Sequence, residues 1–518
     1  AQSLGHEKDS AFRIAAGLRY LLGQAATQEG HVGLPPETLT EAAAAFLEVD
    51  TLNAESVLAD LVTDSRLIED DLIYRPELHR HEVAVAQDLS RRASDPRPLT
   101  RLEGAAAVTR AESAAGVELA EDQRDAILTA LRSRVSVITG GPGVGKTTLI
   151  RVLVHLLATE GLSVSLAAPT GRAARRLEEA TGSNASTLHR LLGLLPSEDG
   201  FRSIREEPLS LDVLIVDEVS MVDISLMAAV VEALPENAGL ICVGDVDQLP
   251  SVGPGEVLGD LIKSKRVPVG RLTTIFRQAE HSSIVRVAHE LNDGQIPTFD
   301  EGREGQAFFV EKTQAEEALD AVLNMVSDRI PNAFELDAKK DVQVITPIHG
   351  GPLGTVALNE ALRDTLNPPQ EDRPEIERFG RLFRQGDKVM QVRNNYDLMV
   401  FNGDIGTLDF LDPDDGHMTV QFHNRKIDYS LDELDQLTPA YAITCHKSQG
   451  SEFPAVVMPL IAGHFVMLRR NLVYTAVTRA KSVLVMVGEP RALSIAASRP
   501  GSGQRHTALK DRLQLHDR

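Results

Sequence analysis

Apolar side chains along the first ninety residues recur with the period of amphipathic helices. The segments 11–28, 39–47 and 54–62 are rich in Ala and Leu, and their apolar positions repeat every three to four residues. The stretch SDPRPLTR, residues 94–101, then carries two prolines, which is typical of a linker. We therefore predict a helical N-terminal domain over residues 1–95.

Short apolar runs alternate with helical patterns after this linker. Four of them, VSVITG, VSLAAP, DVLIVDE and GLICVGD, lie within residues 96–270. A second series, with DVQVITPI, AVVMPL and SVLVMVG, occupies residues 271–377 and 437–518. Because strands that alternate with helices pair in parallel and are covered on both faces, we predict two α/β domains.

The pattern changes between residues 378 and 436. Short runs such as GDKVMQVRN, GDIGTLDFLD and HMTVQFH are separated by Asn-Gly and Asp-Gly turns. Such turns join antiparallel strands, so this segment is predicted to be a small β-barrel inserted into the second α/β domain.

The overall composition is that of a globular protein of several domains. The chain has 518 residues, 42% of them hydrophobic and 25% charged, with a net charge of −22. No apolar run is long enough for a membrane span. Two cysteines, Cys242 and Cys445, suit the cytoplasm, and each is expected to serve as a small apolar residue. The acidic charge argues against a nucleic-acid binder, unless one groove is basic.

The first residues, AQSLGHEKDS, lack both an initiator Met and the apolar centre of a signal peptide. We therefore expect an N-terminally truncated or processed chain, with a segment missing before it.

A phosphate-binding loop follows the first strand of the first α/β domain. Residues Gly140–Thr147 fit the pattern G-x-x-x-x-G-K-T between a strand and a helix. Backbone amides of such a loop surround the phosphates of ATP or GTP, Lys146 reaches the β and γ groups, and the Thr147 hydroxyl holds Mg²⁺. The candidate nucleotide-binding residues are Gly141, Pro142, Gly143, Val144, Gly145, Lys146, Thr147 and Thr148.

Two later strands end in residues suited to hydrolysis. Asp217 and Glu218 close one strand, where the aspartate would hold Mg²⁺ and the glutamate would act as general base toward water. Gln248 follows the next strand and could contact the γ-phosphate. Arg277 and Arg479 lie far downstream, and each could stabilise the transition state from across a cleft, although such arginines are often surface ion-pair partners.

An ordered series of motifs over residues 118–488 resembles the superfamily 1 DNA helicases, specifically the RecD-like 5′→3′ branch of the self-standing type. The motifs are LAEDQRDAI, GGPGVGKTT, AAPTGRAARRL, STLHRLLG, LIVDEVSMVD, GDVDQLPSVGPG, FRQ, ITPIHGGPLGTVALN, AITCHKSQGSEF and YTAVTRAK. The resemblance implies two RecA-like motor domains, an SH3-like barrel, and ATP with Mg²⁺ as cofactors. It further implies that Gln123 reads adenine and that Gly450 and Glu452 lie near the ribose and phosphates.

The same resemblance suggests which residues contact DNA. Pro169 and Thr170 end a parallel strand, where ligands of α/β sheets bind. Arg172 follows on the next helix, together with Arg175 and Arg176, although a basic run of this kind is often only a solvated helix face. The full set of candidates is Pro169, Thr170, Arg172, His189, Asn359, Thr444, His446 and Ser448. Stacking of bases would fall on a few aromatic residues such as Phe401 or Phe453, since the chain has no Trp.

A polar insertion, PSEDGFRSIREEPLS, separates the His189 motif from the Asp217 strand. Its Asp199-Gly200 pair favours a tight turn, so residues 193–210 are a candidate β-hairpin that parts the duplex; a plain crossover is the alternative.

The sequence thus predicts a cytoplasmic, monomeric ATP-driven 5′→3′ translocase and DNA helicase of repair or recombination. Its expected partners are single-stranded DNA and single-strand/double-strand junctions, and protein partners are left open. An RNA helicase and a nucleotide-gated binding scaffold are the alternatives.

Overall fold

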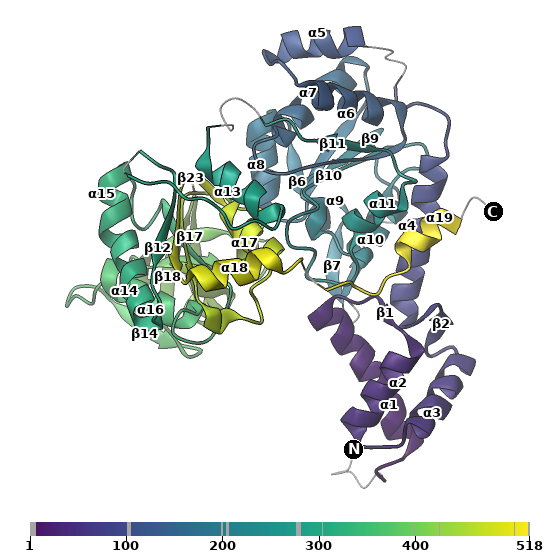
Figure 1. The fold of residues 1–518 in the computed structure, drawn as a ribbon, viewed down its shortest axis with the longest axis horizontal. Helices are drawn as coiled ribbons and strands as arrows, with labels where there is room; N and C mark the ends of the chain where they lie inside the picture. The colour runs from purple at the N-terminus through teal and green to yellow at the C-terminus, as the bar shows by residue number, and fades with distance from the viewer. Residues whose placement is uncertain are drawn as a thin grey trace.

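Two parallel β-sheets form the centre of the protein (Figure 1). The computed structural model describes residues 7–100, 105–197, 200–203, 207–275, 281–302, 304–395, 397–423, 425–501 and 503–515. Arg277 and the hairpin residue Asp199 lie outside this range. The predicted α/β fold with a separate β module is confirmed.

The first α/β domain contains a six-stranded sheet with the order β11-β4-β10-β9-β5-β6. Every described strand pair in it is parallel. In β9, Val213 and Ile215 pack into the core on one face of the sheet and Leu214 and Val216 into the core on the other, as strand alternation requires. The elements of this domain are α5 (Ala105–Ala115), α6 (Glu121–Arg132), β4 (Val135–Gly140), α7 (Lys146–Thr159), β5 (Val164–Ala168), α8 (Gly171–Thr181), β6 (Ala185–Thr187), α9 (Leu188–Leu191), β7 (Leu194–Ser197), β8 (Gly200–Ser203), β9 (Val213–Val216), η3 (Val219–Met221), α10 (Ile224–Ala233), β10 (Gly239–Gly244), α11 (Val257–Ser264) and β11 (Val269–Leu272).

The second α/β domain contains a five-stranded parallel sheet with the order β12-β23-β22-β13-β21. Its strand β22 is buried on both faces, with Val456 and Met458 on one side and Ala455 and Val457 on the other. Its elements are α13 (Ser283–Asn292), β12 (Ala307–Glu311), α14 (Ala315–Asn324), η4 (Met325–Arg329), α15 (Ile330–Phe334), β13 (Val342–Thr346), α16 (Thr355–Leu366), β21 (Ala442–Thr444), η6 (His446–Ser448), β22 (Phe453–Leu460), η7 (Ala462–His464), α17 (Arg470–Val477), β23 (Ala480–Gly488) and α18 (Pro490–Ser498).

A small β-domain is inserted between α16 and β21. Five antiparallel strands in the order β19-β18-β17-β16-β20 enclose a separate core around Leu408, Val420 and Tyr429, and the hairpin β14–β15 adds Phe383 to it. Its strands begin before and end after the predicted 378–436. The elements are β14 (Glu375–Arg378), β15 (Arg381–Arg384), β16 (Lys388–Gln391), β17 (Ile405–Asp412), β18 (His417–Phe422), β19 (Arg425–Ser430), η5 (Leu431–Gln436) and β20 (Leu437–Pro439).

The N-terminal domain is helical, as predicted, but it also holds a three-stranded sheet, β1-β3-β2, that the helical pattern did not reveal. Its last helix, α4, packs on α10, and Val85, Ala86 and Leu89 join the core of the first α/β domain. The elements are α1 (Ala11–Gln24), η2 (Ala25–Glu29), β1 (Gly33–Leu34), α2 (Pro36–Leu47), α3 (Thr51–Thr63), β2 (Ile68–Asp70), β3 (Leu72–Tyr74) and α4 (Pro76–Ala93).

The C-terminal tail, residues 499–515, returns to the first α/β domain. Its helix α19 (Leu509–Leu515) lies beside α4 and α11 (Figure 1), and Leu509 and Leu513 are fully buried there. The predicted boundary, which assigned residues 437–518 to the second α/β domain, is therefore wrong for the tail. Amphipathic spacing shows that a segment is buried, but it does not show which neighbour buries it.

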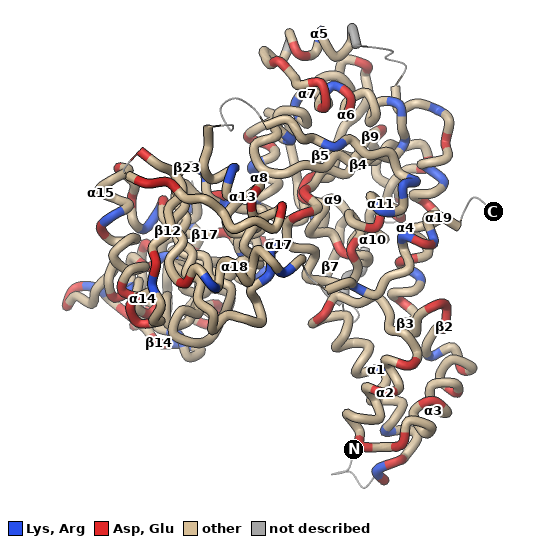
Figure 2. Tube along the Cα trace, in the orientation of Figure 1, with Lys and Arg blue, Asp and Glu red and all other residues tan. Residues whose placement is uncertain are grey.

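Charged residues of both signs are spread over all the domains in Figure 2. The net charge of −22 is thus not confined to one part of the molecule, and any basic binding surface has to be local.

Candidate active site

The loop between β4 and α7 has the geometry of a phosphate cradle. Gly143 and Gly145 adopt left-handed φ angles of 76° and 75°, which favour glycine. The Lys146 amine donates hydrogen bonds to the carbonyl oxygens of Gly140 and Gly141, at 2.6 and 2.8 Å. The lysine therefore lies across the loop, at the N-terminus of a helix, where an anion is favoured.

Asp217 and Glu218 follow β9 directly, at the same edge of the sheet as the loop. The backbone N–H of Glu218 donates to Oδ1 of Asp217 at 2.9 Å. Burial, and then the charge of Glu218, raises the pKa of Asp217 to about 6. Glu218 has a φ of 54°, a strained conformation for a residue with a side chain. The fold thus holds two carboxylates together near Lys146, whose charge lowers the pKa of Asp217.

Gln248 belongs to a loop that both α/β domains hold. Its Nε2 donates to Oδ2 of Asp245 at 3.1 Å, and the hydroxyl of Tyr474, on α17 of the second domain, donates to the same oxygen at 2.8 Å. The backbone N–H of Leu249 donates to Oγ1 of Thr475 at 2.9 Å. We call residues 245–255 the sensor loop. Gln248 and a residue of the other α/β domain therefore share one acceptor oxygen.

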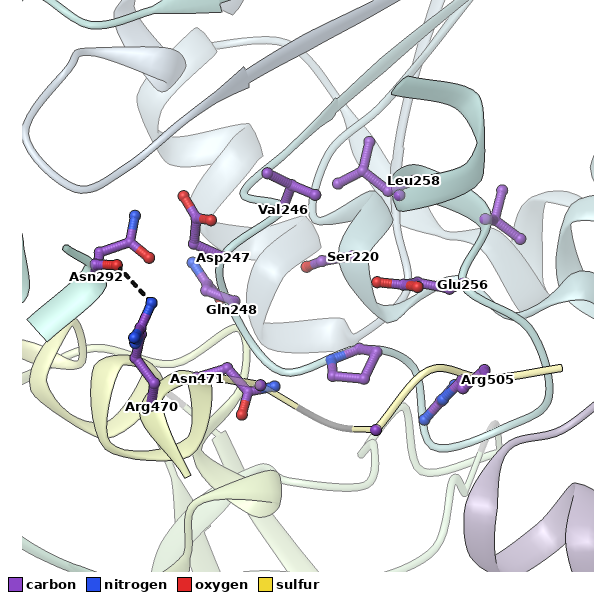
Figure 3. A pocket seen from close by; sticks show the side chains of 15 residues that line it. Ser220, Val246, Asp247, Gln248, Glu256, Leu258, Asn292, Arg470, Asn471 and Arg505 are labelled. Atoms are coloured by element: carbon purple, nitrogen blue, oxygen red, sulfur yellow. Dashed lines mark hydrogen bonds between the residues drawn. The ribbon is translucent and has the colours of Figure 1, made fainter. Parts of the chain in front are cut away.

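Figure 3 shows a cavity of about 250 Å³ beside this loop. Asp247, Gln248 and Glu256 line it from the first α/β domain, while Arg470 and Asn471 line it from the start of α17. The tail contributes Gly501, Gly503 and Arg505 to the wall. The cavity is therefore part of the cleft between the two α/β domains.

Asp245 and Tyr474 were missed by reasoning from the sequence. Both stand inside recognised motifs, GDVDQLPSVGPG and YTAVTRAK, but their place in those motifs did not assign a role to either. Their pairing was visible only in three dimensions, since 229 positions separate them.

Gln123 does not have the surroundings predicted for it. Its side chain is fully buried, its Nε2 donates to the carbonyl of Val144 at 2.7 Å, and its Oε1 accepts from the N–H of Ala120. No part of the amide is exposed to read a base. Gln123 is thus bonded to the phosphate-binding loop in this structure, and its contact with adenine stays a prediction.

Gly450 and Glu452 face helix α8 rather than the phosphate-binding loop. Gly450 has a φ of 69°, and an added Cβ would come 2.8 Å from Oγ1 of Thr170. Glu452 forms ion pairs with Arg176 at 2.7 Å and with Lys481 at 3.5 Å. Both residues therefore lie at the contact between the two α/β domains, and their place near the ribose and phosphates stays a prediction.

Arg479 is buried at the end of α17. Its guanidinium donates to the carbonyls of Thr475 and Ser451 and to the hydroxyl of Thr478, all within its own domain. A role at the γ-phosphate would require Arg479 to exchange these partners, and it stays a prediction. So does the role of Arg277, which lies outside the described residues.

The arginines of α8 contact other domains, and Arg175 and Arg176 remain partly exposed to solvent. Arg172 donates to Oγ of Ser451 at 2.8 Å and lies 5.2 Å from the ring centre of Phe453. Arg175 pairs with Asp404 of the small β-domain at 3.2 Å. One guanidinium nitrogen of Arg172 is thus engaged with Ser451, and the predicted phosphate contact of this arginine stays a prediction.

Two further candidates for DNA contact have structural roles. Asn359 uses its amide to hold the backbone of Thr355 and Ala442, and Ser448 is fully buried and donates to the Cys445 carbonyl. Phe401 and Phe453, the suggested stacking residues, are buried as well. A contact of these residues with DNA stays a prediction, since sequence position alone does not show what a polar or aromatic group packs against.

The remaining candidates are accessible at the ends of strands. Pro169, Thr170, His189 and Thr444 are half-buried, and His446 is exposed. Thr170 also caps α8 by accepting from the N–H of Ala173. Burial lowers the pKa of His189, so this side chain favours the neutral form. Lys447, which was not predicted, is exposed beside them.

Cys242 and Cys445 are buried, as expected of small apolar residues. No helix in the described part of the chain is long and apolar enough to cross a membrane. The described residues also contain no cluster of three or more His, Cys, Asp or Glu side chains that could hold a metal by themselves.

Models of three protein families match this chain. One described as an AAA domain matches residues 118–308, the SH3 domain of ATP-dependent RecD-like DNA helicases matches 358–422, and a UvrD-like helicase C-terminal domain matches 439–487. The ATP-dependent RecD2 DNA helicase of Deinococcus radiodurans is 35% identical over 530 residues, which cover 99% of this chain and 71% of that protein. The chain belongs to the RecD-like DNA helicase family.

Other RecD proteins are also similar to the chain. The RecBCD enzyme subunit RecD of Mycobacterium tuberculosis is 32% identical over 490 residues, which cover 86% of this chain and 81% of the subunit. Among solved structures, Bacteroides Pif1 bound to ssDNA has a TM-score of 0.45 and 21% identity over 71% of this chain and 92% of that one. That likeness is too slight to bear on function. The RecD-like assignment confirms the predicted family and enzyme class, an ATP-dependent DNA helicase.

Proposed function

We propose that this RecD-like protein couples ATP hydrolysis to 5′→3′ movement along single-stranded DNA, and that it unwinds duplexes in DNA repair or recombination. The observation that carries the proposal is the shared carboxylate of Asp245, on which Gln248 of one α/β domain and Tyr474 of the other converge. Such a link lets the state of the nucleotide set the distance between two domains that grip a strand.

The chemistry would follow from the residues at the ends of β4, β9 and β10. Lys146 would neutralise the β- and γ-phosphates, and Glu218 would accept a proton from the attacking water. The strained backbone of Glu218 keeps its carboxylate beside Asp217 in this role. Gln248 would contact the γ-phosphate or the attacking water, and hydrolysis would free it to relax toward Asp245.

Magnesium fits the oxygen-bearing residues at this edge. Thr147 and Asp217 would hold the ion, since two protein ligands together with substrate phosphates are usual for Mg²⁺. Asp217 is buried next to a second carboxylate that raises its pKa, and a cation would relieve that repulsion. When bound, Mg²⁺ would neutralise charge that develops on the phosphates.

The strand would pass over the ends of β5, β6 and β21, where the accessible candidates gather. Thr170, His189, Thr444 and His446 would contact phosphates or bases there, and the exposed amine of Lys447 would add a positive charge. Such contacts read the backbone and tolerate any sequence.

The segment after the His189 motif forms a hairpin. Strands β7 and β8 pair antiparallel with Leu194 opposite Ser203 and Ser197 opposite Gly200. Leu194 anchors the hairpin in the core of the first α/β domain, whereas Leu195 is 44% exposed. We infer that this hairpin separates the two strands of a duplex as the motor pulls one of them past it.

Strand displacement on tailed duplexes tests the function. Unwinding should need ATP and a 5′ single-stranded DNA tail, and the Lys146→Ala variant should show none. A requirement for a 3′ tail would reverse the proposed direction, and preference for an RNA duplex would make the protein an RNA helicase. Sedimentation of the protein on the same substrates would test whether it acts as a monomer.

A further inference from the structure

A basic cavity of about 650 Å³ lies between α8, the small β-domain, the residues before β13, and the first residues of β22 and β23. Seven of the side chains that line it are Lys or Arg and three are Asp or Glu. This excess is local, since the whole chain carries a net charge of −22.

The carboxylates in the wall neutralise only part of this charge. Asp404 pairs with Arg175 at 3.2 Å, and Glu452 pairs with Arg176 at 2.7 Å and with Lys481 at 3.5 Å. The third, Glu179, is exposed at the rim.

Four other cations of the wall have only neutral partners or none among the described residues. Arg172 bonds to the hydroxyl of Ser451, and Lys339 bonds to an amide oxygen and a carbonyl. Lys340 is exposed at the opening, and Lys388 lies deeper. Positive charge therefore remains uncompensated in the cavity.

Lys388 is a buried lysine in the wall of this cavity. It begins β16, is only 5% exposed, and donates one hydrogen bond to the carbonyl of Val342 at 3.1 Å. Within the described chain, no carboxylate lies at ion-pair distance from its amine. Burial, and then the positive charge of Arg172, lowers the pKa of Lys388 to about 7. A buried amine costs free energy in its charged form unless an anion compensates it.

The cavity also adjoins the hydrolytic residues. Arg176, in its wall, acts electrostatically on Asp217 together with Lys146, and lowers the pKa of that carboxyl group. One side of the cavity is therefore close to the edge of the sheet where the γ-phosphate would be cleaved.

We propose that the basic cavity is a second phosphate site, in which Lys388, Lys340 and Arg172 bind a phosphate group separately from the phosphate-binding loop. The group could come from two sources, inorganic phosphate released by hydrolysis or a phosphodiester of the bound strand. Which of these two sources supplies the phosphate group depends on the proposed function. The existence of the phosphate site does not depend on it.

Titration of inorganic phosphate without nucleotide tests the site directly. The Lys146→Ala background removes the lysine of the phosphate-binding loop, and calorimetry at constant ionic strength then reports the remaining site. Lys388→Met should weaken phosphate binding about tenfold, because a buried charged hydrogen bond is lost. Lys340→Ala should weaken it by roughly two- to threefold, as expected for an exposed charge. Lys426→Met, at an exposed lysine of the same small β-domain, serves as the matched control and should change nothing.

Two further measurements, made with Lys146 intact, identify the source. If it is inorganic phosphate, Lys388→Met should relieve inhibition of the ATPase by added phosphate and leave oligonucleotide affinity unchanged. If it is the strand, the same variant should weaken oligonucleotide binding about tenfold by fluorescence anisotropy.

Unchanged phosphate affinity in both folded variants, Lys388→Met and Lys340→Ala, would overturn the site. A wild-type protein without ATPase activity would contradict the proposed function instead, and the titration would still decide on the site.

Discussion

The hydroxyl of Tyr474 donates a 2.8 Å hydrogen bond to Oδ2 of Asp245 across the cleft between the two α/β domains. Both groups are buried, and the contact with Asp245 contributes to a pKa of Tyr474 well above its usual value. The same carboxylate oxygen accepts from Gln248. The pair therefore joins the proposed sensor of hydrolysis to the helix of the opposite domain.

Replacement of Tyr474 by Phe should lower the DNA-stimulated kcat for ATP about tenfold and change KM less. The variant keeps the ring but loses a hydrogen bond to a charged group, worth about 1.5–3 kcal/mol. Steady-state ATPase assays measure both constants. Tyr441→Phe is the control, since Tyr441 makes a similar buried bond to Asp387 away from the cleft. Equal effects of the two substitutions would argue against a special role of the cleft.

Glu218→Gln should still bind ATP, but its turnover number should fall about 10²- to 10⁴-fold, since the amide cannot accept the proton of water. Equilibrium binding of a fluorescent ATP analogue and single-turnover hydrolysis separate the two effects. Asp212→Asn serves as the control and should leave turnover unchanged. Asp212 directly precedes the same strand, and its carboxylate accepts hydrogen bonds from the backbone N–H and the hydroxyl of Ser163. Normal turnover by Glu218→Gln would move the general base elsewhere.

Replacement of residues 195–202 by a short Gly/Ser turn should abolish most duplex unwinding and spare DNA-stimulated ATPase. The new turn can be short because Leu194 and Ser203 are paired across the hairpin, and Leu194 stays in the core. Strand displacement and translocation assays on the same preparation give the comparison. Wild-type unwinding by this variant would return the hairpin to a plain connection.

Arg505→Lys should lower kcat roughly three- to tenfold, because one amine cannot replace a guanidinium fork. Arg505, in the tail, donates to the carbonyls of Ser251, Gly253 and Gly255, and so fixes the end of the sensor loop. Arg499→Lys is a matched control, as Arg499 bonds the carbonyl of Phe465 far from that loop. A kcat that falls in both variants alike would indicate a general effect of the tail.

Asp260→Asn should raise the melting temperature at pH 8 but not at pH 4. Burial raises the pKa of Asp260 to about 7, against a lowering by its bond to Thr507 of the tail. Since the folded pKa lies above the unfolded one, wild-type stability should fall as the pH rises from about 4 to 7. This loss of folding free energy is on the order of 1–3 kcal/mol. Because the amide of Asn is neutral at every pH, the variant should not show it.

Calorimetric scans of wild type and Asp260→Asn across this range measure the effect. The exposed Asp511→Asn substitution, on α19, is the control. Parallel pH profiles of wild type and Asp260→Asn would show that Asp260 is not the group responsible.

The sequence by itself determined the elements that depend on neighbouring residues. The phosphate-binding loop and the pair Asp217–Glu218 are each set by a strand, a turn and the next few residues, so their spacing along the chain already predicts their geometry. Alternation of apolar runs likewise predicted both parallel sheets, because such strands must be buried on two faces.

Only the tertiary structure decided which polar groups are free to act. Arg172 and Asn359 stand in recognisable motifs, yet each bonds a residue that is distant in the chain, Ser451 for the arginine and Ala442 for the asparagine. The link from Tyr474 to Asp245, the return of the tail and the basic cavity around Lys388 join residues far apart in the chain. Local patterns cannot specify such contacts, because they arise from how whole domains pack and from which groups that packing removes from water.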